Sequence, residues 1–585
     1  MADLTKKTLR DSAGMRWTAL LLLALAMFCS YIFMDILSPI KDLMQDTRGW
    51  DSETFGRMQG AEVFLNVYVF FLIFAGIILD KMGVRFTAVL SGAVMLGGAL
   101  IKWYAVSDSF TGTGLYDWFT ANLNYIPGFD ELGVAPFVGE RWVVLVDGVE
   151  KVIRPGEFDS SVMVVKDVIA AMPASAKLAS LGFMIFGCGA EMAGITVSRG
   201  IVKWFKGKDT ALAMGSEMAL ARLGVATCML FSPMFAKLGG VVDVSRSVAF
   251  GVVLLSIALI MFLVYFFMDK KLDSQTGEAE EKDDPFRISD IGGILKDKGF
   301  WLVAILCVLY YSAIFPFQKY AVNMIQCNLT LDEPGADSFW AGTGVTVIQY
   351  VIMLIVAASA FASNFVKDRN LKIGLLATAI VALISYCVMG YMRQSAEAIF
   401  AVFPLLAVGI TPILGNYVGN KGKAASMLVL GSILLIVCHL TFAFVLPLFK
   451  GNTVGGVVVA YLTILVLGAS FSLVPAALWP SVPKLVNQKV IGSAYALIFW
   501  IQNIGLWLFP LLIGKVLDST NSEIIAQVKA GTMSEDVAAV SYDYKWALVM
   551  LATLGVCALL VGLYLRVVDG KKHLGLEKPF NEDAQ

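Results

Sequence analysis

The sequence is poor in histidine, in paired cysteines and in charge, and each shortage excludes a class of site or protein. Only His439 and His573 are present, so a His-based metal site is not expected. The eight Cys are scattered without a Cys-X-X-Cys spacing, which argues against a redox pair or a zinc site. The net charge is −1 and no long basic or acidic block occurs, so nothing indicates a nucleic-acid partner. We expect no metal and no cofactor.

Charged residues make up only 16% of the chain, whereas hydrophobic residues make up 58% and the mean hydropathy is +0.75. A soluble globular protein is usually about 45–50% apolar. The composition therefore predicts an all-α polytopic membrane protein embedded in a lipid bilayer.

Apolar runs of about 20 residues, long enough to cross the hydrocarbon core, fall into two sets. The first set lies near 17–37, 58–79, 86–105, 178–198, 209–235 and 244–268. A polar segment, 269–299, follows and is expected to be a cytoplasmic linker. The second set lies near 300–324, 339–363, 372–391, 396–418, 424–448, 454–480, 490–516 and 545–566. The chain is thus expected to have about 14 transmembrane helices.

Basic residues follow or precede these runs on a single side of the membrane if every run crosses it. They include Lys6, Lys7, Arg10, Lys81, Arg85, Arg199, Lys203, Lys270, Lys271, Lys367, Arg369, Lys421, Lys423, Lys571 and Lys572. The positive-inside rule assigns that side to the cytoplasm. We therefore expect a multi-pass protein of a bacterial cytoplasmic (inner) membrane, with both termini cytoplasmic.

Residues 106–177 form the longest segment on the opposite side and are expected to form an extracytoplasmic cap. An Asp147-Gly148 turn between β-branched runs in 141–153 predicts a β-hairpin. Residues 159–172 are expected to form an amphipathic helix opened by an Asp or Ser cap.

Two charges lie in the middle of apolar runs, where an ionised group costs a few kcal/mol. Glu191 occupies the middle of the run 178–198, and Arg222 the middle of 209–235. Such charges normally face a bundle interior or a water-filled cavity and mark a substrate path. The alternative is a permanent Glu191–Arg222 salt bridge that holds two helices together.

A short motif follows the second run: Gly76-Ile-Ile-Leu-Asp80-Lys81-Met-Gly83-Val-Arg85. Asp80 could accept hydrogen bonds at a helix N-terminus, while Gly76 and Gly83 would permit close helix approach and a tight turn. This pattern, in a chain of two halves with a polar linker, resembles the loop between the second and third helices of the major facilitator superfamily. The resemblance implies a conformational latch made of these five residues.

A degenerate copy of the motif occurs at 415–423, with Gly419 in the position of Asp80. It aligns the run 396–418 with the second helix of the first half. The implied plan is two six-helix bundles, 1–268 and 300–585, with a two-helix hairpin inserted at 339–391. Peripheral packing or a partner surface is the simpler role for that hairpin, and lining of the substrate path is the alternative.

Further segments narrow the resemblance. Residues 202–208 (VKWFKGK), 477–482 (ALWPSV) and 501–506 (IQNIGL) are similar to the branch that includes the lysosomal dipeptide uniporter of animals. In that branch the acid on the fourth helix and the Arg on the fifth act at the charged ends of the substrate, which implies Glu191 and Arg222 here. Residue chemistry agrees, because a guanidinium matches a carboxylate bidentately and a buried carboxylate suits an ammonium.

Other polar residues are candidates to line a substrate cavity, with helix–helix or interface contacts as the alternative. These are Lys319, Tyr320, Trp479, Gln502 and Asn503. Asp35 and Glu62 sit in or near the outer ends of the first two runs. Solvated carboxylates at the cavity mouth are the default interpretation for this pair, and proton coupling is the alternative.

The sequence therefore predicts a secondary active or facilitative transporter that moves a small zwitterionic solute by alternating access. A dipeptide is the specific expectation, and it depends on the resemblance. The alternatives are a transporter of nitrate or carboxylate anions and a non-transporting membrane sensor. Direct ATP drive is not expected because no Walker A pattern occurs, and neither is an enzyme. We expect a monomer with a small-molecule substrate, and an accessory subunit is compatible with the sequence.

Overall fold

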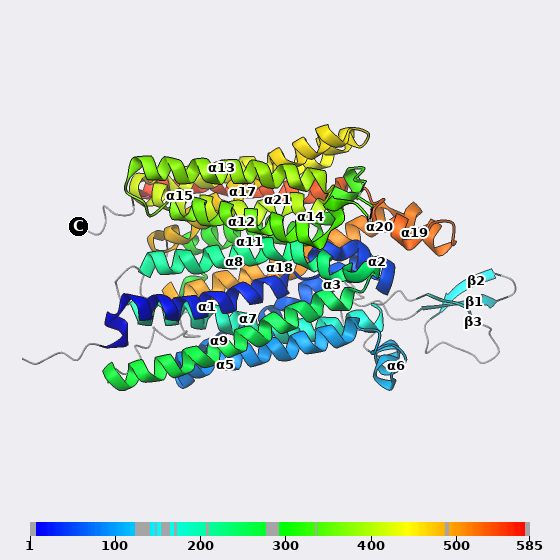
Figure 1. Ribbon diagram of the computed structural model, residues 1–585, viewed down its shortest axis with the longest axis horizontal. Coiled ribbons are helices and arrows are strands. Elements are labelled where there is room, and N and C mark those ends of the chain that lie inside the picture. The colour runs from blue at the N-terminus through cyan, green and yellow to red at the C-terminus, as the bar shows by residue number, and fades with distance from the viewer. Residues whose placement is uncertain are drawn as a thin grey trace, which may run out of the picture.

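The computed structural model describes residues 8–122, 141–146, 149–153, 164–168, 172–205, 210–276, 292–332, 334–335, 337–485 and 491–579. Long helices lie side by side along the longest axis of the molecule (Figure 1). The first and last described helices have their outer ends at one end of this bundle, and a small β-sheet lies at the other (Figure 1). We call these the termini end and the sheet end.

The helices of the first half, the N-half, and those of the second half, the C-half, are separated by the polar segment after α9. The N-half contains α1 Ala13–Met34, α2 Lys41–Arg48, α3 Ser52–Gly60, α4 Phe64–Val69, α5 Phe71–Val106, α6 Gly114–Ala121, α7 Ala174–Phe205, α8 Thr210–Ala236 and α9 Val244–Thr276. The C-half contains α11 Lys298–Asn328, α12 Thr343–Ala362, α13 Arg369–Met392, α14 Ala396–Phe400, α15 Val402–Lys421, α16 Ala424–Leu440, α17 Thr453–Leu485, α18 Ile491–Thr520, α19 Ser522–Lys529, α20 Glu535–Ala539 and α21 Lys545–Lys572.

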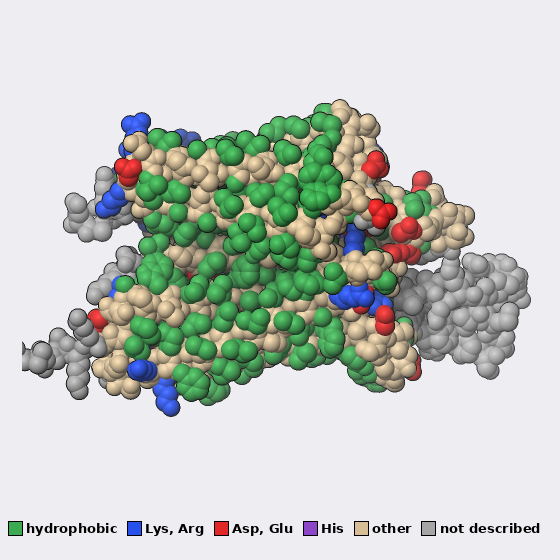
Figure 2. Space-filling model, in the orientation of Figure 1, with side chains coloured by type: hydrophobic (Ala, Val, Ile, Leu, Met, Phe, Trp, Pro, Cys, Tyr) green, Lys and Arg blue, Asp and Glu red, His purple; other side chains and the backbone are tan. Residues whose placement is uncertain are grey.

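In the described part of the chain, 13 helices are long and apolar enough to span a membrane. Figure 2 shows hydrophobic side chains across the middle of the visible face and charged ones gathered toward the two ends. The amphiphilic pattern along the long axis fits a protein whose helices cross a bilayer. The prediction of a polytopic helical membrane protein is confirmed.

Helix α5 consists of two helices that meet at Gly83, whose backbone is not helical (φ 80, ψ 166). Ahead of this break, a Cβ on Gly187 in α7 would collide with the Glu62 carbonyl oxygen. Further along, Asp80 lies 2.7 Å from the Arg199 guanidinium near the C-terminal end of α7. This part of the chain therefore runs along α7 toward the termini end.

The segment after Gly83 runs the opposite way. A Cβ on Gly182, near the start of α7, would lie only 2.6 Å from the backbone nitrogen of Lys102. The chain reverses at Gly83, so α5 supplies the end of one span and the whole of the next. The first of these two spans is completed by α3 and α4, which agrees with separate spans near 58–79 and 86–105.

The first transmembrane segment is interrupted at Asp35. Pro39 lacks a backbone N–H and its ring cannot fit against the carbonyl four residues earlier, that of Asp35. Helix α1 ends at Met34, a 3₁₀ turn covers Ser38–Ile40, and α2 continues to Arg48. The second segment is also interrupted, without a proline, by a 3₁₀ turn at Ala61–Val63 that contains Glu62. Both carboxylates thus lie at helix breaks inside the bundle.

The cap contains a three-stranded antiparallel sheet in the order β2-β1-β3, made of β1 Arg141–Val146, β2 Val149–Ile153 and β3 Val164–Val168. The hairpin predicted for 141–153 is confirmed, while its turn residues 147–148 lie outside the described residues. The helix predicted for 159–172 is wrong where the structure describes it, because 164–168 form β3. Valines at 162, 164, 165 and 168 explain this outcome, since β-branched residues favour strands.

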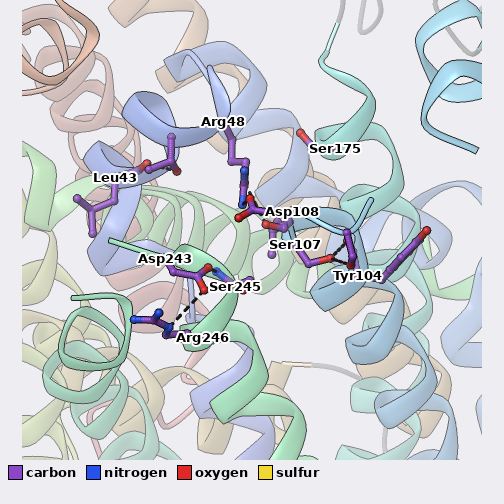
Figure 3. Close-up of polar contacts among 12 residues, drawn as sticks. Leu43, Arg48, Tyr104, Ser107, Asp108, Ser175, Asp243, Ser245 and Arg246 are labelled. Carbon is purple, nitrogen blue, oxygen red and sulfur yellow. Dashed lines mark hydrogen bonds and ion pairs between the residues drawn. The ribbon is translucent and has the colours of Figure 1, made fainter. Parts of the chain in front are cut away.

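The loops of the N-half are pinned to one another at the sheet end (Figure 3). The Arg48 guanidinium lies 2.6 Å from Asp108 and donates to the Val106 carbonyl at 3.0 Å, which joins the end of α2 to the end of α5. Asp243 lies 3.3 Å from Arg246 at the start of α9. The Arg48 contacts thus link α2 to the end of α5, whereas the Asp243–Arg246 pair is local to the start of α9.

The inserted hairpin packs on the outside of the bundle. Its first helix, α12, contacts α15 in the C-half and α8 in the N-half. Tyr350 on α12 accepts a hydrogen bond from Thr227 on α8 at 3.3 Å, and its ring lies edge-on to Phe231 at 4.9 Å. The structure therefore places the hairpin at a peripheral seam between the halves. At the linker, α9 continues through Thr276, so the start of segment 269–299 is helical.

Candidate functional site

Arg222 lies between the two halves, with its guanidinium against aromatic rings. Its central carbon is 4.8 Å, 5.1 Å and 5.8 Å from the ring centroids of Phe471, Phe315 and Tyr31. Arg222 and Tyr31 come from the N-half, and the two phenylalanines come from the C-half. Ring faces attract a cation but leave its N–H donors unused. The guanidinium is therefore held in place while its hydrogen-bonding edge stays available to an anion.

The aromatic wall (Tyr311, Phe315, Phe471, Trp479 and Phe499) extends from Arg222 across the C-half. Trp479 donates its indole N–H to the Tyr311 hydroxyl at 3.0 Å and stacks on Phe499 at 4.9 Å. Tyr311 stacks on Phe315 at 5.3 Å, and Phe315 meets Phe471 at 5.7 Å. Trp479, predicted to line the cavity, is part of this wall.

Glu191 also lies at the interface between the halves. It is half-buried on α7, and its Oε1 accepts a long hydrogen bond of 3.5 Å from Asn503 on α18. Gln502 behaves differently, because its Oε1 accepts from the Cys307 thiol on α11 at 3.2 Å. The structure thus brings Asn503 to Glu191, whereas Gln502 joins two helices of the C-half.

Glu191 and Arg222 do not form an ion pair with each other in the described part of the chain, where Glu191 accepts from Asn503 and Arg222 lies against aromatic rings. Both lie within electrostatic range of Tyr31 on α1. The permanent salt bridge considered from the sequence is not present in this conformation. Among the described residues, the Glu191 carboxylate and the Arg222 guanidinium are therefore not paired with each other.

A second acid, Glu217, belongs to this region and was missed from the sequence. It lies on α8 before Arg222, and it interacts electrostatically with both Arg222 and Tyr31. Its signal was present, because a charge inside an apolar run is the same signal that identified Glu191 and Arg222. Two carboxylates and one guanidinium therefore lie within electrostatic range of Tyr31.

Lys319 is bound into an ionic cluster. Its Nζ lies 2.8 Å from Asp35 Oδ1, 4.0 Å from Glu62 Oε2 and 3.1 Å from the Met34 carbonyl. Asp35 also accepts from Gln318 at 2.7 Å and from Ser38 at 3.1 Å. Asp35 is 1% exposed, so the default interpretation as a solvated mouth carboxylate is wrong. The break at Pro39 turns this carboxylate into the bundle.

Tyr320 closes the sheet end. Its hydroxyl lies 2.9 Å from the carbonyl oxygens of both Ser52 and Pro510, so it joins α3 of the N-half to α18 of the C-half. Close beside it, a Cβ on Gly56 would collide with the Pro510 carbonyl. Tyr320 is 1% exposed and is occupied by these contacts, which places it in the seal between the halves.

Further bonds between the halves surround this seal. Lys41 donates to Asn323 at 3.2 Å, Gln326 donates to Asp42 at 3.2 Å, and the backbone N–H of Glu53 donates to Asp518 at 2.7 Å. Gln45 donates to the Tyr542 hydroxyl at 3.2 Å. Burial raises the pKa of Tyr542, so this hydroxyl stays protonated at ordinary pH. The structure thus represents a conformation closed at the sheet end.

The latch motif joins helices within the N-half. Asp80 pairs with Arg199 at 2.7 Å, and Arg85 pairs with Asp273 on α9 at 3.1 Å. The expected role of Asp80 at a helix N-terminus is therefore replaced by an ion pair with α7. Gly83 makes the turn as predicted. Gly76 does not allow a close helix approach, because a Cβ there would meet nothing within 4 Å. The Lys81 side chain is exposed.

Comparison with known proteins agrees with this architecture. Residues 168–401 match the family model of the Major Facilitator Superfamily. The lysosomal dipeptide transporter MFSD1 of Homo sapiens is 25% identical over 352 residues, and that of Bos taurus is 24% identical over 352 residues. The human match covers 58% of this chain and 60% of the relative. The chain therefore spans less than two thirds of the length of these relatives.

Solved structures show the same fold at low identity. A mutant of the nucleoside transporter NupG gives a TM-score of 0.55 at 12% identity, with 93% of this chain and 99% of that chain covered. A bacterial homologue of the human lysosomal transporter Spinster, inward-facing and occupied, gives 0.54 at 12% identity, with 94% and 97% covered. By fold and by sequence similarity over part of its length, this multi-pass membrane protein is therefore similar to proteins of the Major Facilitator Superfamily, and it resembles the lysosomal dipeptide transporters MFSD1.

Proposed function

We propose that the protein moves a small zwitterionic solute, most specifically a dipeptide, across the membrane by alternating access. The observation that supports this most is that Glu191 and Arg222 lie at the interface of the two halves without pairing with each other. A guanidinium binds a carboxylate bidentately, and a carboxylate binds an ammonium. A zwitterion with both termini free would occupy both groups at once. The dipeptide choice rests on the similarity to the MFSD1 relatives.

The aromatic wall would accept the apolar part of such a solute. Rings pack against side chains of different shapes with little directional demand, while the charged ends fix the orientation. Since α7 and α8 carry Glu191 and Arg222, and α11, α17 and α18 carry the wall, the solute would contact both halves. Rocking of the halves about a site held by both is the usual alternating-access arrangement.

The orientation is part of the proposal. The basic loops at the termini end favour placing that end in the cytoplasm, with the sheet on the opposite side. A monomer in the bilayer would suffice for transport, because both halves of the site come from one chain. The hairpin α12–α13 leaves room for an accessory subunit at the periphery.

A thermal-shift screen of purified protein is the first test. The ligands are dipeptides, the same dipeptides with one terminus blocked, free amino acids, nitrate and small carboxylates. Binding to the folded state raises Tm by mass action. A ligand at a concentration one hundred times its Kd adds about 2.7 kcal/mol to the free energy of unfolding. We expect stabilisation by dipeptides that is lost when either terminus is blocked. Stabilisation by anions alone would instead support an anion transporter.

Two substitutions test the charged pair in a flux assay with proteoliposomes. Glu191→Gln keeps the shape of the side chain but removes its charge, and Arg222→Lys keeps the charge but removes the planar fork. Each is expected to abolish dipeptide uptake while Tm in the absence of ligand changes little. Glu523→Gln, on the exposed helix α19, is the control. Normal uptake by either site variant would show that the Glu191/Arg222 pair is not part of the mechanism. If the wild type binds dipeptides but gives no flux, the protein would instead be a membrane sensor.

A further inference from the structure

Lys102 is a buried cation that the proposed function does not use. Its side chain is 0% exposed, and its Nζ has no hydrogen-bond partner among the described residues. The ammonium lies 3.5 Å from the ring centroid of Phe183 and 5.2 Å from that of Phe33. Ring faces stabilise a cation by about 0.5–2 kcal/mol, whereas transfer of an ammonium from water into a protein interior costs several kcal/mol. A partner carboxylate is therefore expected in another conformation.

Two carboxyl groups lie within electrostatic range of Lys102. The electrostatic neighbours of Lys102 are Lys319, Glu62, Asp35 and the Cys228 thiol. Both ammonium groups lie near the same ring, since Lys102 Nζ is 3.5 Å and Lys319 Nζ is 6.0 Å from the centroid of Phe183. The cluster thus spans α1, the turn after α3, α5 and α11, with α8 contributing the thiol.

Glu62 faces charges from several elements. Its electrostatic neighbours are Lys319 on α11, Asp35 after α1, Glu191 on α7 and Lys102 on α5. The hydroxyl of Tyr31 on α1 also interacts with it. Every one of these groups except Lys319 belongs to the N-half.

This division between the halves decides what happens when the sheet end opens. In the closed state, two acids, Asp35 and Glu62, lie near Lys319, and Lys102 lies within electrostatic range of both acids. Opening withdraws Lys319 together with Gln318, two of the three groups that bond the Asp35 side chain. The N-half then retains two carboxylates and one cation inside the membrane.

We propose that this cluster is a proton-binding site that exchanges one lysine for the other. When the halves part at the sheet end, Lys102 becomes the partner of Glu62, and Asp35 binds a proton from the solution on that side. When the sheet end closes, the Lys319 ammonium returns to Asp35 and the proton is released toward the termini end, because the sheet end is then sealed. One proton thus accompanies each opening and closing of the sheet end.

The test measures this opening without any solute, so its failure is distinct from failure of the proposed function. Spin labels are placed at Ser109 of the N-half and Glu523 of the C-half, both exposed at the sheet end. Cys387 and Cys557, the half-buried cysteines, are first replaced so that labelling is selective. The fraction with a long inter-label distance is followed between about pH 4 and pH 9, the range of ordinary and buried carboxyl groups.

Uptake of one proton predicts that the ratio of open to closed protein falls about tenfold per pH unit within the titrating range. Asp35→Asn, which resembles the protonated acid, should open the sheet end at every pH and abolish the slope. Gln318→Leu is the matched control: it removes a neutral bond to the same carboxylate and should raise the open fraction without changing the slope.

Lys102→Met should make the slope steeper at the alkaline end, approaching about a hundredfold per pH unit, because Glu62 then also needs a proton on opening. Lys102→Arg should restore the single-proton slope. A pH-independent distance in the wild type, or an unchanged slope in Asp35→Asn, would overturn the proposal. If Lys102→Met fails to fold, the contrast between Asp35→Asn and Gln318→Leu still decides it.

Discussion

At the scale of single residues, the setting of Arg222 explains how a permanent cation is kept inside the membrane. Three ring faces lie within 5.8 Å of its guanidinium carbon, and Glu217 supplies a negative charge in its neighbourhood. Ring faces stabilise the cation without filling its donor edge. A carboxylate ligand at that edge would have Glu217 as a competing negative charge nearby.

Glu217→Gln tests this competition. Removing the acid leaves Arg222 with less opposing charge, so a ligand carboxylate should bind several-fold more tightly, by about 1 kcal/mol at the effective dielectric near a solvated cavity. Kd is measured by calorimetry for a ligand that the thermal-shift screen identifies. Glu523→Gln is the control, because that residue is exposed on α19. Weaker binding in Glu217→Gln would show instead that Glu217 contacts the ligand directly.

The sequence predicts the charged members of the site better than the neutral ones. A charge inside an apolar run is rare enough to be informative, which is why Glu191 and Arg222 could be found. The same reasoning applies to Glu217, which it overlooked. Phe315 and Phe471 could not be found, because aromatic residues occur throughout apolar helices and only the packing of α11 against α17, next to Arg222 on α8, brings them to the guanidinium.

At the scale of elements, close helix contacts depend on glycine at particular positions. On α7, a Cβ at Gly187 would collide with the carbonyl of Glu62, whereas a Cβ at Gly194 would meet nothing within 4 Å. The Gly187 contact brings α7 against the helix break that presents Glu62 to the ionic cluster.

Gly187→Ala is therefore expected to lower Tm and to disturb the cluster. Gly194→Ala, on the same helix, should leave Tm unchanged or raise it, because alanine favours a helix over glycine by about 1 kcal/mol. Thermal unfolding followed by tryptophan fluorescence compares the two. Equal melting temperatures in the two variants would mean that the close contact of α7 with the second span at Gly187 does not contribute to stability.

The two copies of the latch motif show how much of an element can be predicted from a pattern. Gly83 and Gly422 occupy matching positions in the copies, and both have positive φ, 80° and 74°. The turn was therefore correctly aligned, since such φ values favour glycine. The helix breaks at Asp35 and Glu62 could not be predicted equally well, because Pro39 indicates a kink but not where the carboxylate beside it will point.

At the scale of the whole molecule, the described bonds at the sheet end tie the N-half to the C-half. Tyr320 joins α3 to α18, while Lys41 and Gln326 contribute bonds farther out. Alternating access requires these bonds to break as a group when the sheet end opens. The strength of each one therefore sets the population of the closed state rather than the stability of either half.

Tyr320→Phe and Tyr310→Phe separate these two effects, because both tyrosines lie on α11 and both are buried. The hydroxyl of Tyr320 bonds across the halves to Ser52 and Pro510, whereas that of Tyr310 bonds within the C-half to Leu428 and Ser432 on α16.

A buried hydrogen bond contributes about 1 kcal/mol, so Tyr320→Phe should raise the ratio of open to closed sheet ends about fivefold. Tyr310→Phe should lower the free energy of unfolding by a similar amount, and Tm with it. The ratio of open to closed sheet ends should stay unchanged, because the Tyr310 hydroxyl bonds within the C-half in both conformations. The spin-label distance across the sheet end and the thermal unfolding curve together distinguish them. An equal shift of the distance in both variants would mean that the C-half does not move as one body, and that the seal at Tyr320 is only part of the general packing of α11.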